Sequence, residues 1–172
     1  MRKKARFIFI LTVLIVINGF GQKGYWTEAK RIITTEDLKH VLGDWHGSLT
    51  YVDYGTGKPF SMPANLSVAQ GKNDRVYVLR HSYPNEPKAN GKDKIKISND
   101  GRQLNEQHLV SKKVSETGQI ELTTEYKGRD DNRHALIQMT YILDDAEFVI
   151  RKEVRFDESG DWIMRNEYRY IR

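Results

Sequence analysis

The stretch Gly43-Asp44-Trp45-His46-Gly47-Ser48-Leu49-Thr50-Tyr51 decides the fold of this chain. Its pattern repeats every two residues: Trp45, Leu49 and Tyr51 share one face, and polar side chains occupy most of the positions between them. Strict alternation of this kind is typical of a β-strand with one buried face. We therefore predict that the Trp45 side of this strand points into the core.

The residues before this strand predict a short helix. Thr34 or Thr35 is placed to cap its start, and an acidic side chain follows in the first turn. Apolar residues then fall on one helical face at i, i+3, i+4 spacing, namely Leu38, Val41 and Leu42. Gly43 is expected to end the helix, because glycine tolerates a positive φ.

Beyond Tyr51 the chain continues as short strand-like segments separated by turn residues. The predicted strands are 64–69, 75–83, 94–98, 104–110, 120–126, 135–143, 147–156 and 162–171. The gaps are too short for crossover helices, so the strands should pair antiparallel as an up-and-down meander of about 8–10 strands. Closing such a sheet removes its edges, which predicts an all-β antiparallel barrel; an open two-sheet clam with the same connectivity is the alternative.

The first 21 residues read as a secretory signal peptide. Four basic residues precede the apolar run 7–17, and Gly19 and Gly21 supply the small residues of a cleavage site after Gly21. The run is shorter than the roughly 20 apolar residues of a membrane-spanning helix. We expect a protein without a membrane span after cleavage, located in the periplasm or secreted.

Composition limits the remaining function classes. The chain has 28 Lys and Arg against 23 Asp and Glu, but the leader takes four of the bases, which leaves a formal charge of +1 on residues 22–172. The positive charge therefore argues little for nucleic-acid binding. Residues 22–172 suit one domain, expected to be a monomer, and the absence of Cys means that packing and hydrogen bonds must hold it together.

Gly43 and Trp45, placed after a short helix at the start of the first long strand, resemble the Gly-x-Trp motif of lipocalin-like (calycin) barrels. The resemblance implies a basic residue from the last strand packed over the indole, a part that Arg165 or Arg169 could take. The chain lacks the disulfide of many secreted lipocalins and the late Arg-x-Tyr pair of fatty-acid-binding relatives, so a fatty-acid ligand is not implied. Its Gly-rich turns and its lack of Cys, in a chain with a predicted leader, also resemble uncharacterised exported proteins of Gram-negative bacteria.

Two cations stand out on faces otherwise expected to be apolar. Lys152 lies between Ile150 and Val154, and Arg80 is in phase with neighbouring valines. A buried cation needs a carboxylate, a bound anion or a path to water. The functional interpretation is an anion site, with hydrogen-bonding groups from Tyr141, Asn166 and Tyr168. The structural interpretation is that each cation reaches the rim or pairs with Glu106.

Other chemistry has little support in the sequence. The histidines are scattered, which predicts no metal site, although single-histidine haem ligation by His81 or His108 stays open. The Asp residues of 130–131, 144–145 and 157–161 occupy predicted turns without calcium-loop spacing. We find no catalytic residues and no resident cofactor.

The function that we expect is binding of a small, partly apolar molecule, with an anionic end, inside the barrel. Residues 83–91 would form a flap beside the mouth. Two alternatives remain: an exported protein with a filled core that acts through its surface, and a barrel enzyme. An exposed apolar patch would favour the first, and converging groups with shifted pKa values would favour the second.

Overall fold

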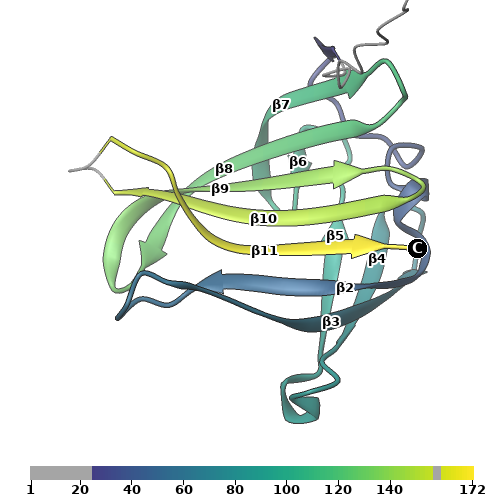
Figure 1. Ribbon diagram of the computed structural model, residues 1–172. Helices are drawn as coiled ribbons and strands as arrows, with labels where there is room; N and C mark the ends of the chain where they lie inside the picture. The colour runs from purple at the N-terminus through teal and green to yellow at the C-terminus, as the bar shows by residue number, and fades with distance from the viewer. Residues whose placement is uncertain (1–24, 157–159) are drawn as a thin grey trace, which may run out of the picture.

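The computed structural model describes residues 25–156 and 160–172, which form an antiparallel sheet of eleven strands (Figure 1). The predicted leader, residues 1–21, lies outside the described residues. The strands are β1 (Trp26–Glu28), β2 (Gly43–Val52), β3 (Pro59–Gln70), β4 (Val76–Ser82), β5 (Gly91–Lys96), β6 (Gln103–Leu104), β7 (Gln107–Ser115), β8 (Ile120–Asp130), β9 (Arg133–Leu143), β10 (Glu147–Phe156) and β11 (Ile163–Ile171). Their order is β1-β7-β8-β9-β10-β11-β2-β3-β4-β5, with β6 paired to β7.

The predicted antiparallel meander is confirmed, but the predicted closed barrel is wrong, because the sheet does not close. Strand β5 is the last in the order, and just beyond its end the chain meets β6 at a single bridge, between Ile97 and Leu104, with hydrogen bonds between Lys96 and Asn105 beside it. The reason is local: β6 has two residues before the chain turns at Asn105 and Glu106, whose φ angles of 52° and 68° form a tight turn. Strand β6 is therefore too short to form a ladder with β5. The prediction of one strand over 104–110 missed this turn.

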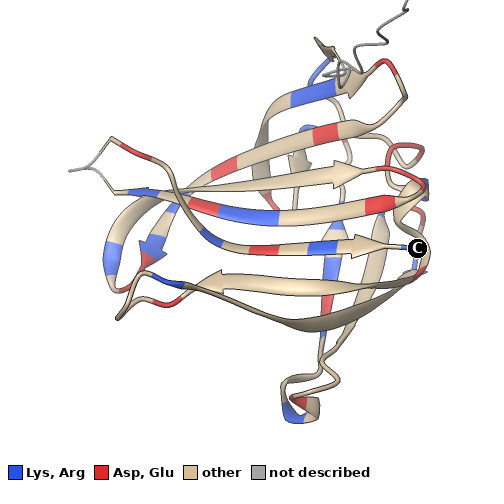
Figure 2. Cartoon of the chain, in the orientation of Figure 1, with Lys and Arg blue, Asp and Glu red and all other residues tan. Residues whose placement is uncertain are grey.

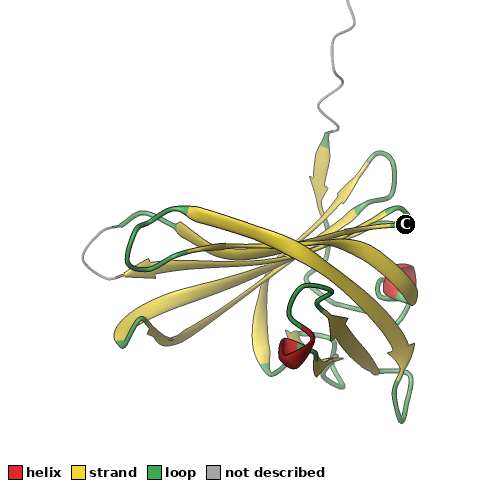
Figure 3. Ribbon diagram, turned by 60° about the horizontal axis from the view of Figure 1, so that its bottom comes forward, coloured by secondary structure: helices red, strands yellow, loops and turns green. Residues whose placement is uncertain are grey.

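The predicted N-terminal helix is also wrong. The described residues contain only two 3-10 helices, η1 (Lys39–Val41) and η2 (Pro87–Ala89), at the margins of the sheet (Figure 3). None of the described helices has the length and apolar character needed to cross a bilayer. A helix this short gains little from its own hydrogen bonds, and tertiary contacts hold the segment instead: Asp37 accepts hydrogen bonds from the Thr34 N–H at 2.7 Å and from Lys112 Nζ at 2.6 Å. Gly43 does have the expected positive φ, at 108°.

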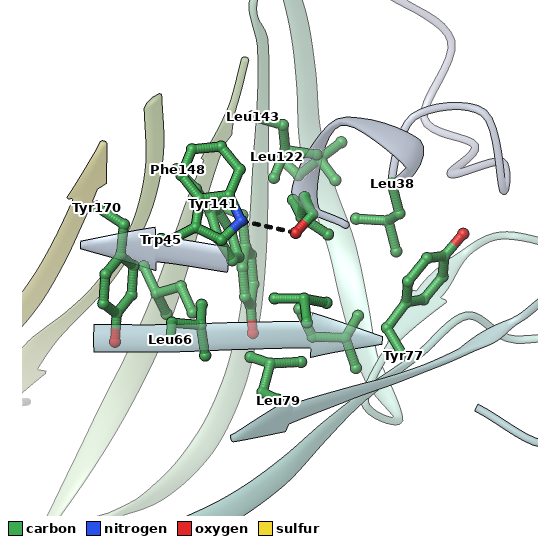
Figure 4. Close-up of a cluster of buried hydrophobic side chains, with 14 of the residues drawn as sticks. Leu38, Trp45, Leu66, Tyr77, Leu79, Leu122, Tyr141, Leu143, Phe148 and Tyr170 are labelled. Carbon is green, nitrogen blue, oxygen red and sulfur yellow. Dashed lines mark hydrogen bonds between the residues drawn. The ribbon is translucent and has the colours of Figure 1, made fainter. Parts of the chain in front are cut away.

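The Trp45 face of β2 points into the core, as predicted, and Trp45 is 1% exposed. Its indole N–H donates to the Val41 carbonyl at 2.8 Å, and its ring lies 6.0 Å from that of Phe148 (Figure 4). Burial also alternates along the later strands. Leu122, Tyr141, Phe148 and Tyr170 are buried in one hydrophobic core cluster together with Trp45. The curled sheet therefore has a concave, mainly apolar inner face.

A bulge between β10 and β11 breaks this alternation. Lys152 pairs with Asn166 but Glu153 pairs with Met164, which leaves Arg165 as the extra residue. The phase of β11 changes there, so Met164 pairs with Glu153, a residue of the outer face. A bulge can redirect a side chain in this way, and it turns Arg165 toward the concave side.

Candidate functional site

A pocket of about 290 Å³ opens in the concave face, and we call it the inner pocket. It lies between β4 and β5 on one side and β9, β10 and β11 on the other. Its lining consists of Leu79, His81, Gly91, Lys92, Asp93, Lys94, Ile95, Asn105, Tyr141, Ile150 and Tyr168. At about 30 Å³ for each water of liquid, the volume corresponds to roughly ten water molecules, at the small end of ligand pockets.

Aromatic rings follow one another along one wall of the inner pocket. The ring of His81 lies 5.3 Å from Tyr168 and 6.5 Å from Tyr83, and the rings of Tyr168 and Tyr170 stack at 5.8 Å. Hydrogen bonds link them, since the hydroxyls of Tyr83 and Tyr168 are 2.8 Å apart and His81 Nδ1 is 3.1 Å from the Tyr170 hydroxyl. These contacts fix the rings, of which His81 and Tyr168 line the pocket.

Burial keeps these groups uncharged. It lowers the pKa of His81, an effect that the charge of Asp93 opposes. It raises the pKa of Tyr141 and, with the hydrogen bond to Tyr83, that of Tyr168. The imidazole and both phenols are therefore neutral near pH 7, and they offer hydrogen bonds rather than charge.

The inner pocket is reached across the free edge of β5. A second hollow of about 540 Å³ adjoins it, is lined by Lys96 and Glu106, and shares Lys92, Asp93, Lys94 and Asn105 with it. Asn105 marks one end of this opening, because its N–H donates to the Lys96 carbonyl and its side-chain oxygen accepts from the Lys96 N–H, each at 2.8 Å. The predicted flap, 83–91, ends beside the pocket at Gly91. A hydrogen bond joins its two ends, because the Tyr83 N–H donates to Asn90 Oδ1 at 2.7 Å.

Of the five predicted binding residues, the structure brings Tyr141 and Tyr168 together in the inner pocket. Asn166 does not line it; this half-buried residue lies further along β11, opposite Tyr51 and Lys152. Neither predicted cation reaches the pocket either. The structure therefore does not bring the five residues together in one pocket.

Lys152 faces inward as predicted, but its partner is Asp130, the last residue of β8. Lys152 Nζ lies 2.7 Å from one carboxylate oxygen of Asp130, and Arg165 Nε lies 2.8 Å from the other. The Tyr54 hydroxyl also donates to Asp130, at 3.0 Å, and its ring stacks under the Arg165 guanidinium at 4.3 Å. The side chain of Asp130 is only 2% exposed. The cluster is therefore a set of buried ion pairs within the protein, in which both cations already have a carboxylate partner.

Arg80 faces outward, contrary to its predicted phase. The inward residues of β4 are Tyr77 and Leu79, both buried, and the valines that suggested the opposite phase alternate with them. Arg80 instead lines an open groove of about 750 Å³ on the outer face of β2–β5. A strand with apolar residues on both faces does not reveal from its sequence which face is buried.

The cation over the Trp45 indole is Arg172, at 4.1 Å from the ring centroid, rather than Arg165 or Arg169. The pairing of β11 with β2 explains this, because Ile171 lies opposite His46 and the next residue falls opposite Trp45. Arg172 also donates to the carbonyls of Leu42 and His40. Arg169 lies on the outer face, where it pairs with Glu147 and Glu167 among the charges of β10 and β11 (Figure 2).

Sequence reasoning missed the pocket roles of Asp93 and Asn105 and the burial of Asp130. Asp93 could have been found by alternation with Ile95, whereas Asn105 depends on the unexpected turn. Asp130 was interpreted as a turn residue, since the two-residue turn at Asp131 and Asn132 follows it directly. Among the described residues, no three His, Cys, Asp or Glu side chains converge as a metal site would require.

Comparisons with known proteins add a distant structural likeness. No protein-family model and no curated protein matches the sequence. Among solved structures, the Rv2717c protein of M. tuberculosis is similar with a TM-score of 0.46 and 11% identity, over 82% of this chain and 98% of that one. The strand pairing of this chain itself makes it an all-β antiparallel sheet protein, and this neighbour is a distant one.

Proposed function

We propose that the protein binds a small, partly apolar molecule in the inner pocket. The observation that carries this proposal is the lining, in which the apolar side chains of Leu79, Ile95 and Ile150 meet fixed aromatic rings and an equal share of polar groups. A concave site in which apolar side chains meet polar groups that fix orientation is the usual form of a ligand pocket. The ligand would lie against the rings and hydrogen-bond to His81, Tyr141 or Tyr168.

The expected anionic end of the ligand needs revision in this proposal. Arg80 lies on the outer face, and Lys152 is held in an ion pair with Asp130 away from the pocket. Lys92 and Lys94 also border the pocket, but they alternate with Asp93 onto the outer face, so the polar side chains on the inner side are neutral rings, an amide and the carboxylate of Asp93. These groups favour a ligand whose polar end is uncharged or positively charged.

A thermal-shift screen tests the proposal, with native mass spectrometry to identify retained molecules. Lipids, haem, aromatic acids and aromatic amines would be compared on three proteins: the wild type, Ile150→Phe, which fills the pocket, and Ile142→Phe, which adds the same bulk on the outer face. A ligand at 100 times its Kd stabilises by about 2.7 kcal/mol, a rise in Tm of about 5 °C or more. We expect this rise in the wild type and in Ile142→Phe but not in Ile150→Phe. Equal shifts in all three proteins, or none, would reject the pocket as the site.

The wider setting of this function is also a proposal. The protein would be an exported, monomeric relative of the lipocalin-like barrels, a likeness supported by the position of Gly43 and Trp45 and by the cation on the indole. Intact mass of the protein from the cell envelope, expected to begin at Gln22, and its elution volume in gel filtration test export and oligomeric state.

A second candidate function is action through the surface, and one observation favours it. Tyr51, Tyr54 and Phe60, around the turn between β2 and β3, are 38%, 53% and 51% exposed, and the Tyr51 and Phe60 rings lie 5.3 Å apart. An exposed aromatic cluster of this kind often marks a contact site. In cells that lack the protein, the wild type and Phe60→Ser would be compared for their ability to restore the phenotype of the deletion. Failure of Phe60→Ser alone, with ligand binding in the pocket unchanged, would favour this candidate over the pocket.

A further inference from the structure

The inner pocket contains one carboxylate, Asp93, and within the described residues this side chain is in no ion pair. Asp93 lies opposite Leu79, which is 2% exposed, and Ile95 on the same side of β5 is equally buried, so Asp93 belongs to the inward face. Its neighbours Lys92 and Lys94 alternate onto the outer face, because successive residues of a strand point to opposite sides. The two lysines therefore contribute their backbone, not their ammonium groups, to the pocket wall.

One oxygen of the Asp93 carboxylate remains available to a ligand. Its Oδ1 accepts a hydrogen bond from the Lys94 N–H at 2.7 Å, and among residues 25–156 and 160–172 no donor reaches Oδ2 and no ion pair includes Asp93. The charge of Asp93 is felt by His81, Tyr141 and Tyr168, since it acts to raise the pKa of each, after burial in every case. Asp93 is thus an acidic group that lies close enough to act on these neutral rings.

The neighbouring rings favour the same sign of charge. The rings of Tyr141 and Tyr168 line the pocket with that of His81, and the negative face of an aromatic ring attracts a cation. A carboxylate at the mouth and aromatic faces behind it are complementary to one chemical group, a protonated amine.

We infer that the ligand of the inner pocket is a small organic amine, with its ammonium group at Asp93 and its apolar part against Leu79, Ile95 and Ile150. This inference depends on the proposed function and names the class of its ligand. Asp93 sits at an exposed position, so its pairing with the amine is screened by water, while the rings add a cation–π attraction. Together they should favour an amine over an uncharged molecule of the same shape by about tenfold in Kd.

Three probes of nearly equal size test the inference by isothermal titration calorimetry: 2-phenylethylamine, 2-phenylethanol and phenylacetate. On the wild type at pH 7, we expect the amine to bind about tenfold more tightly than the alcohol, and phenylacetate to bind most weakly. Raising the salt concentration should reduce the advantage of the amine and leave the alcohol unchanged. Binding of phenylacetate as tight as that of the amine overturns the inference without any variant.

The variants locate the effect. Asp93→Asn should remove the advantage of the amine while the alcohol binds as before, and Asp44→Asn, the same change on the outer face of β2, should alter neither. An amine preference that survives in Asp93→Asn or in the pocket-filling Ile150→Phe contradicts the assignment. If the alcohol binds in the pocket without any preference for the amine, only this inference fails. If none of the three probes binds, the proposed function fails with it.

Discussion

The two ends of the concave face both contain a buried carboxylate, but they are held in different ways. At the plugged end, the chain itself covers the core: Ile33, Leu38 and Val41, each at most 2% exposed, pack beside Trp45. At the ionic end, defined by Tyr54, Asp130, Lys152 and Arg165, side chains alone span the strands. The inner pocket lies on the same face, lined from β4, β5, β9, β10 and β11.

The carboxylates show the difference most clearly. Asp37 at the plugged end accepts from the Thr34 N–H as well as from Lys112, and Lys112 also donates to the Ile32 carbonyl at 3.1 Å. Asp130 is bound by three side chains from three parts of the chain. The plugged end should therefore depend on apolar packing and the ionic end on a single charge.

The largest expected effect is at the plugged end. Trp45→Ala removes a large ring from a packed core, and losses of this kind destabilise a protein by about 4 kcal/mol. Urea unfolding should show this loss, and Trp26→Ala on β1, where the ring is 39% exposed, should cost less than about 1 kcal/mol. Similar losses for the two variants would mean that the indole does not organise the core.

At the ionic end, Asp130→Asn should cost about 3 kcal/mol at pH 7, because Lys152 and Arg165 lose their buried counter-charge. Asp131→Asn is the matched control: it removes the same charge at the exposed turn, where Asn also tolerates the positive φ of 49°. We expect less than about 0.5 kcal/mol for the control, measured by the same urea titration. Equal effects would contradict the importance of the cluster.

The pH dependence of stability gives a separate measure of the ionic end. Burial acts to raise the pKa of Asp130, but hydrogen bonds from Lys152 and Tyr54 and the positive charges of Lys152 and Arg165 outweigh it, so the pKa lies below its ordinary value. The unfolded state therefore binds the proton first as pH falls below about 4, and the stabilisation by Asp130 is lost from there through the folded pKa. The stability of the wild type should decline more steeply in this window than that of Asp130→Asn. Parallel curves would show that the carboxylate is not stabilised by folding.

The smallest effect should come from the cation over the indole. Arg172→Gln loses a cation–π contact with Trp45 and hydrogen bonds to three carbonyls, together about 1 kcal/mol because the side chain is exposed. Arg169→Gln, on the outer face, should cost about 0.5 kcal/mol or less. Thermal unfolding of both variants shows which one loses more stability. A larger loss of stability in Arg169→Gln would contradict the assignment of Arg172 as the cation that stabilises the Trp45 indole.

The success of sequence reasoning varied with the kind of residue. The alternation of apolar side chains placed Trp45, Tyr141 and Tyr168 on the inner face and gave β10 its observed bounds of 147–156. It could not place Arg80, whose strand has apolar residues on both faces. It identified Lys152 as a buried cation in need of a partner, but the partner, Asp130, comes from a position that resembled an ordinary turn.

What the sequence determined by itself is the all-β antiparallel meander and the inward side of its main strands, because period-two patterning and turn residues are local properties. Only the tertiary structure decided that the sheet stays open beside β5, that residues 34–42 form turns instead of an α-helix, and that a bulge brings Arg165 to Asp130. Each of these depends on which strands meet and in what register. Such pairing is set by contacts between residues far apart in the chain, which no local pattern records.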